Sequence, residues 1–224
     1  MAYDMCALVP PAELAKAAEV AKALGWKGIC VFAGKKEIAG LKEAAKPVKG
    51  FDVAVGLLYE PRSRNELRKH VQSDRKNYEA VAVRSANPEI IRAASETRGV
   101  DIVAGWESGE SGLDYITVKL AAENGVGIAF SMQPLLDAYD RSRAMVMSKM
   151  AEAARFVRKY RTSFVLASGA ISAWDLRSPS ELAAFGSVLG LDGRETRMAL
   201  SGRMLAENRK RLSGKWVMPG VEVE

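Results

Sequence analysis

The side chains that could do chemistry in this sequence are cations, hydroxyls and a few carboxylates, and most follow short apolar runs. Segment 166–179, LASGAISAWDLRSP, is the plainest case: an apolar run ends in Ser168-Gly169-Ala170, and Asp175 and Arg177 follow. Small residues of this kind favour a tight turn with exposed amides and hydroxyls. Such a loop suits phosphate oxygens, although the hydroxyls could instead bond local amides and Arg177 could pair with Asp175.

Other apolar runs are followed by residues of the same kind. Together these segments are called the strand-end face, and they are 33–36 (AGKK), 59–62 (YEPR), 84–87 (RSAN), 105–107 (GWE), 131–133 (SMQ) and 168–170 (SGA). Lys35, Arg62 and Arg84 supply positive charge, while Glu60 and Glu107 are the main carboxylates. This set favours anion binding over bond breaking.

Two kinds of catalytic site conflict with the composition. The chain has one histidine, His70, so a cluster of imidazoles around a metal ion is excluded. His70 is expected within a helix, out of reach of Ser168 or Ser172, which argues against a serine nucleophile. A carboxylate-only Mg²⁺ site remains open, and it would make the chain a self-sufficient barrel phosphoesterase that uses Glu60, Glu107 and Asp175.

The elements that must position these residues recur along the chain. Short apolar runs, most of them starting about every 22 to 27 residues, occupy 3–9, 28–32, 51–58, 78–83, 100–105, 125–130 and 163–167. Continuous apolar runs are typical of parallel strands that are covered on both faces. Residues 12–24 place alanines and leucines on one helical stripe, and Asn87-Pro88 reads as the start of a further helix.

This repeat predicts a TIM-like (β/α) barrel of about seven parallel strands with extra helices at the carboxyl end. We expect one domain over 1–224 with a basic C-terminal extension from about residue 190. A doubly wound sheet stays open as the alternative. A leucine-rich solenoid has no matching signature, and a nucleotide cofactor has no glycine-rich motif to hold it.

The composition indicates which kind of partner the protein binds and in which cellular compartment we expect it. The 33 Lys and Arg against 27 Asp and Glu give a net charge of +6, which suggests a polyanionic partner. Basic segments 61–70, 155–161 and 207–216 are each consistent with a solvated helix face, but together they favour a polyphosphate surface. No signal peptide or membrane span is evident, so we expect a cytoplasmic protein without membrane contact. Cys6 and Cys30 are expected to be free buried thiols, with one disulfide as the alternative.

Several short motifs carry a resemblance to a known family. In chain order they are Val83-Arg84-Ser85-x-Asn87, Val100-Asp101-Ile102-Val103, Lys119-Leu120-Ala121 with Glu123-Asn124-Gly125-Val126, Ser168-Gly169-Ala170-x-Ser172-x-Trp174-Asp175-Leu176-Arg177-x-Pro179, Val188-Leu189-Gly190-Leu191 and Glu207-Asn208-Arg209. In order and spacing the chain resembles archaeal ribonuclease P (RNase P) protein component three, the counterpart of the human thirty-kilodalton subunit, over nearly its whole length.

The resemblance implies a TIM-like barrel related to the polymerase and histidinol phosphatase (PHP) metal hydrolases. Those relatives carry Asp-x-His-x-His on the first strand, where this chain has Asp4, Cys6 and Leu8. Both imidazoles are replaced, so no metal ligand, catalytic residue or protein-bound cofactor is expected. The implied role is to assist a catalytic RNA, with its own Mg²⁺, in removing the 5′ leader of precursor tRNA. The implied partners are the RNase P RNA, protein component two, other RNase P protein subunits and, in the assembled complex, precursor tRNA.

Motif and charge together give the candidate residues for RNA contact or for shaping the strand-end face. They are Lys35, Arg62, Arg84, Ser85, Arg92, Ser168, Ser172 and Arg177. Ser172 could instead cap the helix that includes Trp174. A purely structural subunit that binds another protein and never touches RNA remains an alternative role.

Overall fold

Seven parallel strands form one sheet in which every strand pairs with the next strand of the sequence. The computed structural model describes residues 2–109, 111–213, 216–218 and 221–222. The strands are β1 (Tyr3–Ala7), β2 (Gly28–Ala33), β3 (Asp52–Tyr59), β4 (Ala80–Arg84), β5 (Ile102–Ala104), β6 (Gly127–Ser131) and β7 (Phe164–Ala167). A doubly wound sheet would reverse its strand order at a switch point. The sequential order rules that alternative out and confirms the TIM-like fold.

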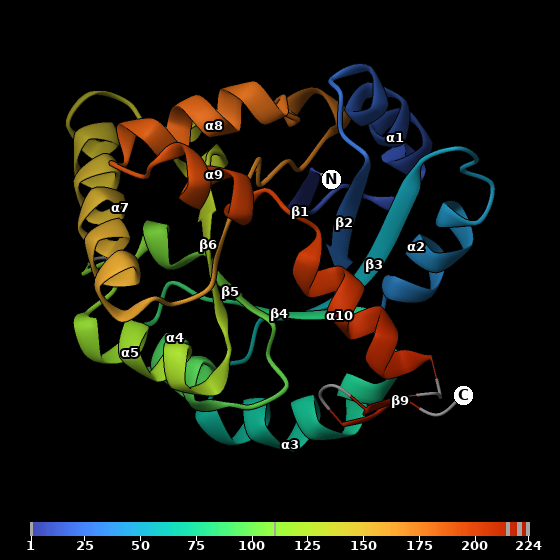
Figure 1. Cartoon of the computed structure of the whole chain (residues 1–224), viewed down its shortest axis with the longest axis horizontal. Helices are drawn as coiled ribbons and strands as arrows, with labels where there is room; N and C mark the ends of the chain where they lie inside the picture. Colours follow the sequence, from blue (N-terminus) through green and yellow to red (C-terminus); the bar gives the residue numbers. More distant parts are fainter. Residues whose placement is uncertain (1, 110, 214–215, 219–220, 223–224) are drawn as a thin grey trace.

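Helices surround the strands (Figure 1). They are α1 (Leu14–Ala23), α2 (Ile38–Ala45), α3 (Arg64–Asp74), α4 (Pro88–Glu96), α5 (Tyr115–Asn124), α6 (Gln133–Asp137), α7 (Asp140–Tyr160), α8 (Pro179–Val188), α9 (Gly193–Ala199) and α10 (Arg203–Leu212). Short 3₁₀ turns occupy Pro11–Glu13, Arg75–Asn77, Trp106–Ser108 and Ala173–Asp175. A short antiparallel pair, β8 (Trp216–Met218) and β9 (Val221–Glu222), follows.

Local sequence signals place two of these helices as expected. The alanine-rich stripe of residues 12–24 forms the 3₁₀ turn Pro11–Glu13 and α1, whose buried side is made mostly of alanine. Asn87 caps α4, because its side-chain oxygen accepts a hydrogen bond from the Glu89 amide at 2.9 Å, and Pro88 is the first helical residue. No helix in the described part of the chain is long and apolar enough to cross a membrane.

The hydrophobic core has two layers because side chains alternate along each strand. One layer lies between the sheet and the helices and contains most of the large side chains. The other fills the barrel and is dominated by small residues, including Ala54, Ala80, Ala82, Ala129 and Ala167. A barrel of so few strands is narrow, so only small residues with a few bulky ones fit inside.

The first and last strands meet without a regular ladder. Within the described residues the hydrogen-bonded order runs from β1 to β7 and stops there, although these two strands contact each other. Instead, the Leu8 amide donates to the Ala170 carbonyl at 2.7 Å, and the Ser168 amide donates to the Asp4 carboxylate at 3.2 Å. The barrel is therefore nearly closed. The contact between β1 and the segment that follows β7 is called the seam.

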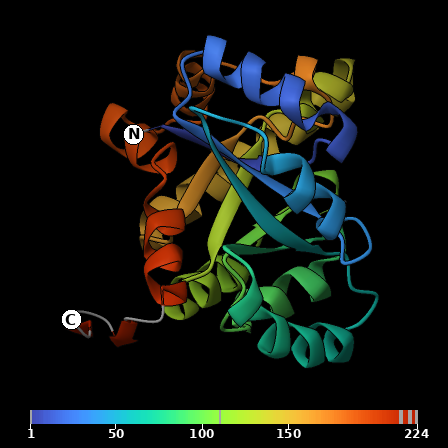
Figure 2. The same ribbon diagram turned by 90° about the vertical axis from the view of Figure 1, so that its right-hand side faces the viewer.

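The C-terminal helix α10 covers the amino ends of the strands. Arg209 bridges Asp52, at the start of β3, and Glu79, just before β4, at 2.6 and 2.9 Å. Asn208 donates to Asp101, which precedes β5, at 3.0 Å. Figure 2 shows the same placement, with α10 beside the end of the barrel where the chain begins. The expectation that segment 207–216 offers free charge to a polyphosphate is wrong for Arg209, and Gly214 and Lys215 lie outside the described residues.

Both cysteines are free and buried, as predicted. Burial raises the pKa of the Cys6 thiol to about 12, and the nearby carboxylates of Asp4 and Glu107 act in the same direction. This thiol is therefore neutral at physiological pH and packs as a small apolar group.

Candidate functional site

Two adjacent cavities open at the carboxyl ends of the strands, and together they are called the mouth of the barrel. One has a volume of about 610 Å³ and the other about 660 Å³. They share the side chains of Leu8, Leu58, Glu60 and Arg84. Barrel proteins of this kind bind their ligands at this end, so the mouth is the candidate site.

Arg84 lines both cavities, and the alternation of side chains along β4 explains its position. It is the last residue of β4 and lies in phase with Ala80 and Ala82, which face the barrel interior. Its side chain is 48 % exposed, and its guanidinium lies 3.7 Å from the Glu60 carboxylate. A solvated pair at this distance is weak and leaves donors available to an anion.

Lys35 lies on the wall of the second cavity. Its ammonium group is 2.5 Å from the Asp74 carboxylate and 5.9 Å from the centre of the Tyr59 ring. The Tyr59 hydroxyl donates to Asp74 as well, and its ring stacks against His70, with the ring centres 6.5 Å apart. His70 belongs to α3 as predicted, yet it also lines this cavity, which was not expected.

Glu107 is the buried carboxylate of the first cavity. Gly105, in the left-handed conformation with φ of 78°, starts the 3₁₀ turn that carries Glu107. The Ser131 amide donates to Glu107 Oε1 at 3.0 Å, whereas Glu107 Oε2 has no hydrogen-bond partner. Burial raises the pKa of Glu107 to about 7, although hydrogen bonds from the backbone and hydroxyl of Ser131 and from the backbone of Gly105 and Glu107 act in the opposite direction.

Gln133 is a second under-used acceptor in the same cavity. Its amide nitrogen donates to Asp137 at 2.9 Å, but its buried oxygen Oε1 has no partner. Both Gln133 and Glu107 line the cavity of about 610 Å³. Each of these two side chains therefore has one buried oxygen without a hydrogen-bond partner.

Ser168, a predicted residue of the strand-end face, is fully buried. Its hydroxyl donates to the Asp4 carboxylate and accepts a hydrogen bond from the Ala170 amide at 3.1 Å. Its hydrogen bonds are made inside the protein, which favours the alternative role given to this residue, that of shaping the strand-end face, over direct RNA contact. The last strand has no regular ladder to the first, and hydrogen bonds between residues 168–170 and Asp4 and Leu8 connect the two strands at the seam instead.

Ser172 and Arg177 also lie away from the mouth. The hydroxyl and amide of Ser172 both donate to Asp175, at 2.8 and 2.9 Å, so Ser172 caps the 3₁₀ turn that contains Trp174. Arg177 donates to the carbonyls of Trp174 and Leu176, at 3.2 and 3.0 Å, rather than to Asp175. Its own carbonyl accepts from Trp26, in the connection that enters β2 at the amino end of the strands.

Of the three remaining candidate residues, one lines the mouth, one lies beside it and one lies away from it. Ser85 lines the first cavity, and its hydroxyl accepts from the Asn87 amide at 3.1 Å. Arg62 is exposed on the connection between β3 and α3, next to the lining residue Pro61. Arg92 pairs with Asp114 on the outer layer of helices and lines neither cavity. The structure thus brings Lys35, Arg84 and Ser85 to the mouth, with Arg62 beside it.

A metal site does not fit the residues present. The Asp4 carboxylate already accepts a hydrogen bond from the Ser168 hydroxyl. The Cys6 thiol is neutral, and the Leu8 side chain has no atom that could bind a metal ion. Asp175 caps a turn outside the mouth, so the carboxylate set Glu60, Glu107 and Asp175 is not assembled. Across the described ranges of the chain, no group of three or more His, Cys, Asp and Glu side chains could hold a metal ion. The carboxylate-based phosphoesterase alternative loses its site.

Sequence reasoning missed the roles of Asp4, Gln133 and His70. Gln133 and Glu107 belong to strand-end segments, so the sequence predicted at which end of the barrel they lie. Their burial depends on α6 and on the turn at Gly105, which the sequence did not predict. Asp4 reaches Ser168 across 164 positions of sequence. No local pattern carries a contact of that separation.

Comparison with known proteins gives one consistent family. The model of the family described as RNase P subunit p30 matches residues 1–212. Ribonuclease P protein component 3 of Methanosarcina mazei is 31 % identical over 99 % of this chain and 95 % of its own length. The protein of the same name from Thermococcus kodakarensis is 34 % identical over 72 % of this chain and 73 % of its own.

The fold comparison agrees. A chain in a cryo-EM structure of archaeal Ribonuclease P with mature tRNA superposes with a TM-score of 0.84 at 21 % identity, covering 99 % of this chain and 97 % of that one. An organophosphorus hydrolase from Deinococcus radiodurans superposes with a TM-score of 0.51 at 13 % identity, covering 91 % of this chain and 92 % of that one, which bears on the fold alone. With a family model matched across nearly the whole chain, this protein belongs to the RNase P subunit p30 family.

Proposed function

We propose that this chain is a non-catalytic protein subunit of RNase P that helps the catalytic RNA to remove the 5′ leader of precursor tRNA. The observation that carries the proposal is the family match over residues 1–212. Within the described residues no group of three or more His, Cys, Asp and Glu side chains could hold a metal ion, which supports our assignment of bond cleavage to the RNA and its Mg²⁺.

The physical contribution of the protein is charge and support. Arg84 and Lys35 lie at the mouth, and Arg62, Arg64, Arg68 and Lys69 lie on the adjoining connection and helix α3. Cations near phosphates release counterions and reduce repulsion between RNA segments. A folded RNA that is neutralised in this way needs fewer free Mg²⁺ ions to hold its active shape.

The proposed partners are the RNase P RNA, protein component two, the other protein subunits and, within the assembled complex, precursor tRNA. No transition metal and no organic cofactor is assigned to the chain itself. The proposed compartment is the cytoplasm.

Reconstitution tests the role. The catalytic RNA is assayed for precursor cleavage across a Mg²⁺ titration, alone and with component two plus this chain. We expect the pair of proteins to lower the Mg²⁺ needed for half-maximal cleavage. Purified chain without RNA should leave a phosphate ester uncut with or without Mg²⁺, and protein-dependent hydrolysis there would overturn the non-catalytic assignment.

Arg84→Ala is the informative variant, with Arg203→Ala as the matched control. Arg203 carries the same charge at the opposite end of the barrel, in an exposed pair with Glu207. Arg84→Ala should raise the Mg²⁺ requirement and make the log–log salt dependence of RNA binding shallower by about one. If both variants behaved like wild type, scaffolding of component two without RNA contact would replace the proposed role of the mouth.

A further inference from the structure

Tyr139 lies at the rim of the first cavity with its side chain in solvent. It directly follows Asp137 and Ala138, which line that cavity. The residue is 72 % exposed, the largest value among the large hydrophobic residues that the structure describes. A tyrosine in a fold usually covers its ring and leaves only the hydroxyl in water. Exposure alone does not make a site, and two further observations at Tyr139 do point to a ligand.

The first observation is that the backbone holds this exposed ring in one place. The Tyr139 amide donates to the Ser142 hydroxyl oxygen at 3.1 Å, and that hydroxyl donates to the Tyr139 carbonyl at 2.6 Å. The next residue, Asp140, has a φ of 43°, in the left-handed region that residues with a Cβ rarely adopt. Backbone strain of this kind persists where the surroundings enforce it, and it gathers at ligand sites.

The second observation is a cation fixed beside the ring. The guanidinium carbon of Arg143 lies 5.5 Å from the centre of the Tyr139 ring, and Arg143 Nε donates to the Ala138 carbonyl at 2.8 Å. Among the described residues, the two terminal nitrogens of this guanidinium have no hydrogen-bond partner. Val146, three residues further along α7, lines the first cavity. Arg143 therefore presents unused donors at the rim of the mouth.

We propose that Tyr139 and Arg143 form a stacking platform for one unpaired nucleotide of RNA. The base stacks on the face of the ring that the guanidinium does not cover, and the terminal nitrogens of Arg143 donate to a phosphate of the same strand. Aromatic rings beside cations are the usual means by which proteins bind unpaired RNA, and the stacking tolerates any base. Arg84, half exposed on the same cavity, continues the positive surface along the mouth.

The charge of the platform favours RNA over a protein partner. A protein that covered the Tyr139 ring would also take the Arg143 guanidinium out of water, and it would have to supply a carboxylate to that cation. RNA repeats a flat base and a phosphate at every nucleotide, so one strand satisfies both side chains. The inference deepens the proposed function, on which it rests, because it gives the mouth a contact with bases as well as with phosphates.

The direct test compares two RNA strands that differ only in their bases. The purified full chain is titrated with an oligoadenylate of about eight nucleotides and with an abasic strand of the same length. The strand with bases should bind at least about fivefold more tightly, because only that strand can stack. Tyr139→Ala should remove this preference and leave the affinity for the abasic strand unchanged. A wild-type chain without any preference for the strand with bases would overturn the proposal.

Further variants separate stacking from apolar contact and from charge. Tyr139→Phe keeps the flat ring and should bind like wild type, whereas Tyr139→Leu keeps an apolar side chain without a ring face and should bind like Tyr139→Ala. Arg143→Ala should make the log–log salt dependence of binding shallower by about 0.7 for both strands. Tyr139→Ala should leave that salt dependence as it is. Equal binding by the Leu and Phe variants would refute stacking.

Tyr115→Ala is the matched control. Tyr115 is an exposed tyrosine, at 53 %, but it starts α5 and lines neither cavity of the mouth. Its loss should leave the preference for the strand with bases unchanged, and thermal unfolding of every variant checks that the fold is retained. Folded Tyr139→Ala and Tyr115→Ala proteins with the same RNA affinity would contradict a platform at Tyr139.

The reconstituted complex distinguishes failure of this inference from failure of the proposed function. With component two present, Tyr139→Ala should weaken binding of the catalytic RNA at least about fivefold. If it did not, while Arg84→Ala still raised the Mg²⁺ requirement, the platform would be wrong and the proposed function would stand. If the pair of wild-type proteins failed to lower the Mg²⁺ requirement, the proposed function itself would fail. If Tyr139→Ala weakened binding of component two and left RNA affinity unchanged, the occupant would be a protein and the proposal would fall.

Discussion

At the scale of single residues, Glu107 makes folding depend on pH. Its pKa rises from 4.5 to about 7 because the folded protein removes the carboxyl from water. The folded state therefore retains a proton that the unfolded chain releases above pH 4.5. The stability that this proton contributes is fully present below pH 4.5 and is lost as pH rises through 7.

We predict that Glu107→Gln removes this dependence. The free energy of unfolding of the variant relative to wild type should increase between pH 4.5 and 7, by up to roughly 3 kcal/mol. Urea unfolding at a series of pH values measures it. Parallel pH profiles for the two proteins would show that Glu107 is solvated in the native state.

At the scale of elements, the seam depends on one hydroxyl. Ser168 donates to the buried Asp4 carboxylate, whose pKa burial raises despite that hydrogen bond. We predict that Ser168→Ala lowers the free energy of unfolding by about 1–3 kcal/mol, because Asp4 loses a donor that water cannot replace. Ser187→Ala is the control, because Ser187 is exposed on α8 and donates only to the backbone carbonyl oxygen of Ala183 in the same helix, and it should cost less than about 1 kcal/mol. Equal losses for the two variants would contradict this role for the seam.

The attachment of helix α10 to the barrel gives a second prediction at the scale of elements. Arg209 donates to Asp52 and Glu79 and fixes the helix across the amino end of the barrel. Because the side chain is 35 % exposed, solvent screens part of the attraction, and Arg209→Ala should cost about 1–2 kcal/mol. Arg203→Ala removes an exposed pair on the same helix and should cost close to nothing. A double-mutant cycle with Asp52→Asn would measure the coupling.

At the scale of the whole molecule, the barrel interior limits side-chain size. Gly56 and Phe32 are paired residues of β3 and β2, and a methyl group at Gly56 would clash with the Phe32 ring. We predict that Gly56→Ala lowers the free energy of unfolding by about 1–3 kcal/mol through overpacking. Combining it with Phe32→Leu should recover part of that loss. Additive losses in denaturant unfolding would mean that the ring moves freely.

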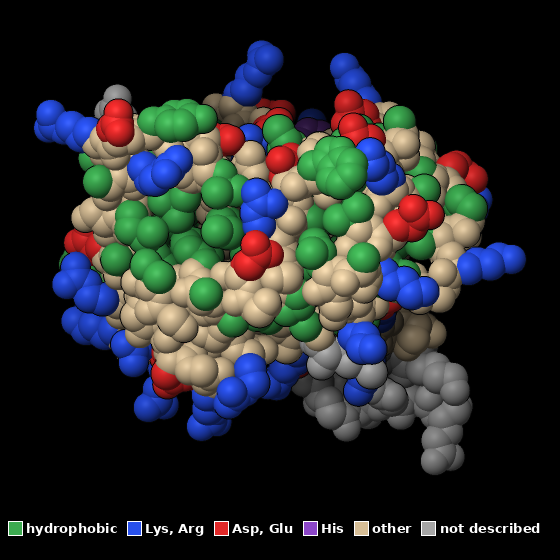
Figure 3. Space-filling model, turned by 90° about the horizontal axis from the view of Figure 1, so that it is seen from above, with side chains coloured by type: hydrophobic (Ala, Val, Ile, Leu, Met, Phe, Trp, Pro, Cys, Tyr) green, Lys and Arg blue, Asp and Glu red, His purple; other side chains and the backbone are tan. Residues whose placement is uncertain are grey.

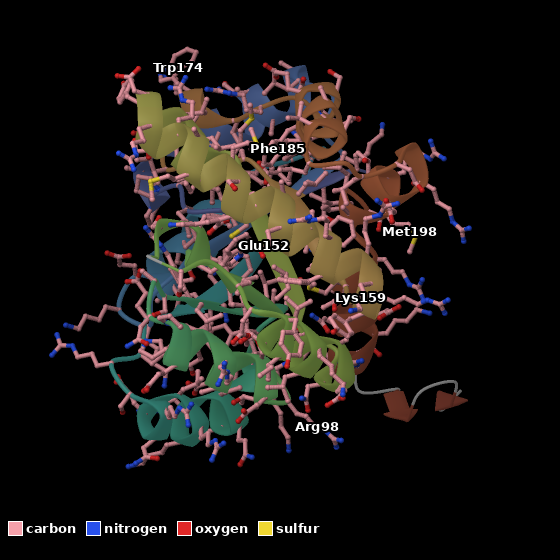
Figure 4. All side chains as sticks on the ribbon, turned by 90° about the vertical axis from the view of Figure 1, so that its left-hand side faces the viewer. Arg98, Glu152, Lys159, Trp174, Phe185 and Met198 are labelled. Atoms are coloured by element: carbon pink, nitrogen blue, oxygen red, sulfur yellow. The ribbon has the colours of Figure 1, made fainter. Side chains whose placement is uncertain are left out.

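The distribution of charge is a second property of the whole molecule. Segment 155–161 ends α7 close to the start of β7, and Lys159 lies in Figure 4 at the end of α7 away from Trp174. In Figure 3, which looks onto the α1 and α8 side, Lys and Arg project around the outline while hydrophobic side chains gather within it. The basic segments therefore point in several directions, and only segment 61–70 adjoins the mouth. RNA contact by the other two would need a separate surface.

The sequence by itself determined the elements and their kind. Continuous apolar runs, the 3.6-residue helical pattern, turn residues and the Asn87 cap depend on neighbours within a few positions, and they predicted the strands, α1 and the start of α4 correctly. The parallel, repeated βα order led to the barrel, and the motif order led to the family. The placement of Lys35 and Arg84 at strand ends also follows from local order.

The tertiary structure alone decided which strand-end residues are free to act. Ser168 and Arg84 both follow an apolar strand, yet the first is buried at the seam and the second is half exposed at the mouth. Their difference comes from Asp4, Glu60 and the closure of the barrel, which are contacts across large separations in sequence. The burial that gives Glu107 and Gln133 their unpaired oxygens has the same origin. Desolvation is a property of the assembled surroundings, and a linear pattern of residue types does not contain it.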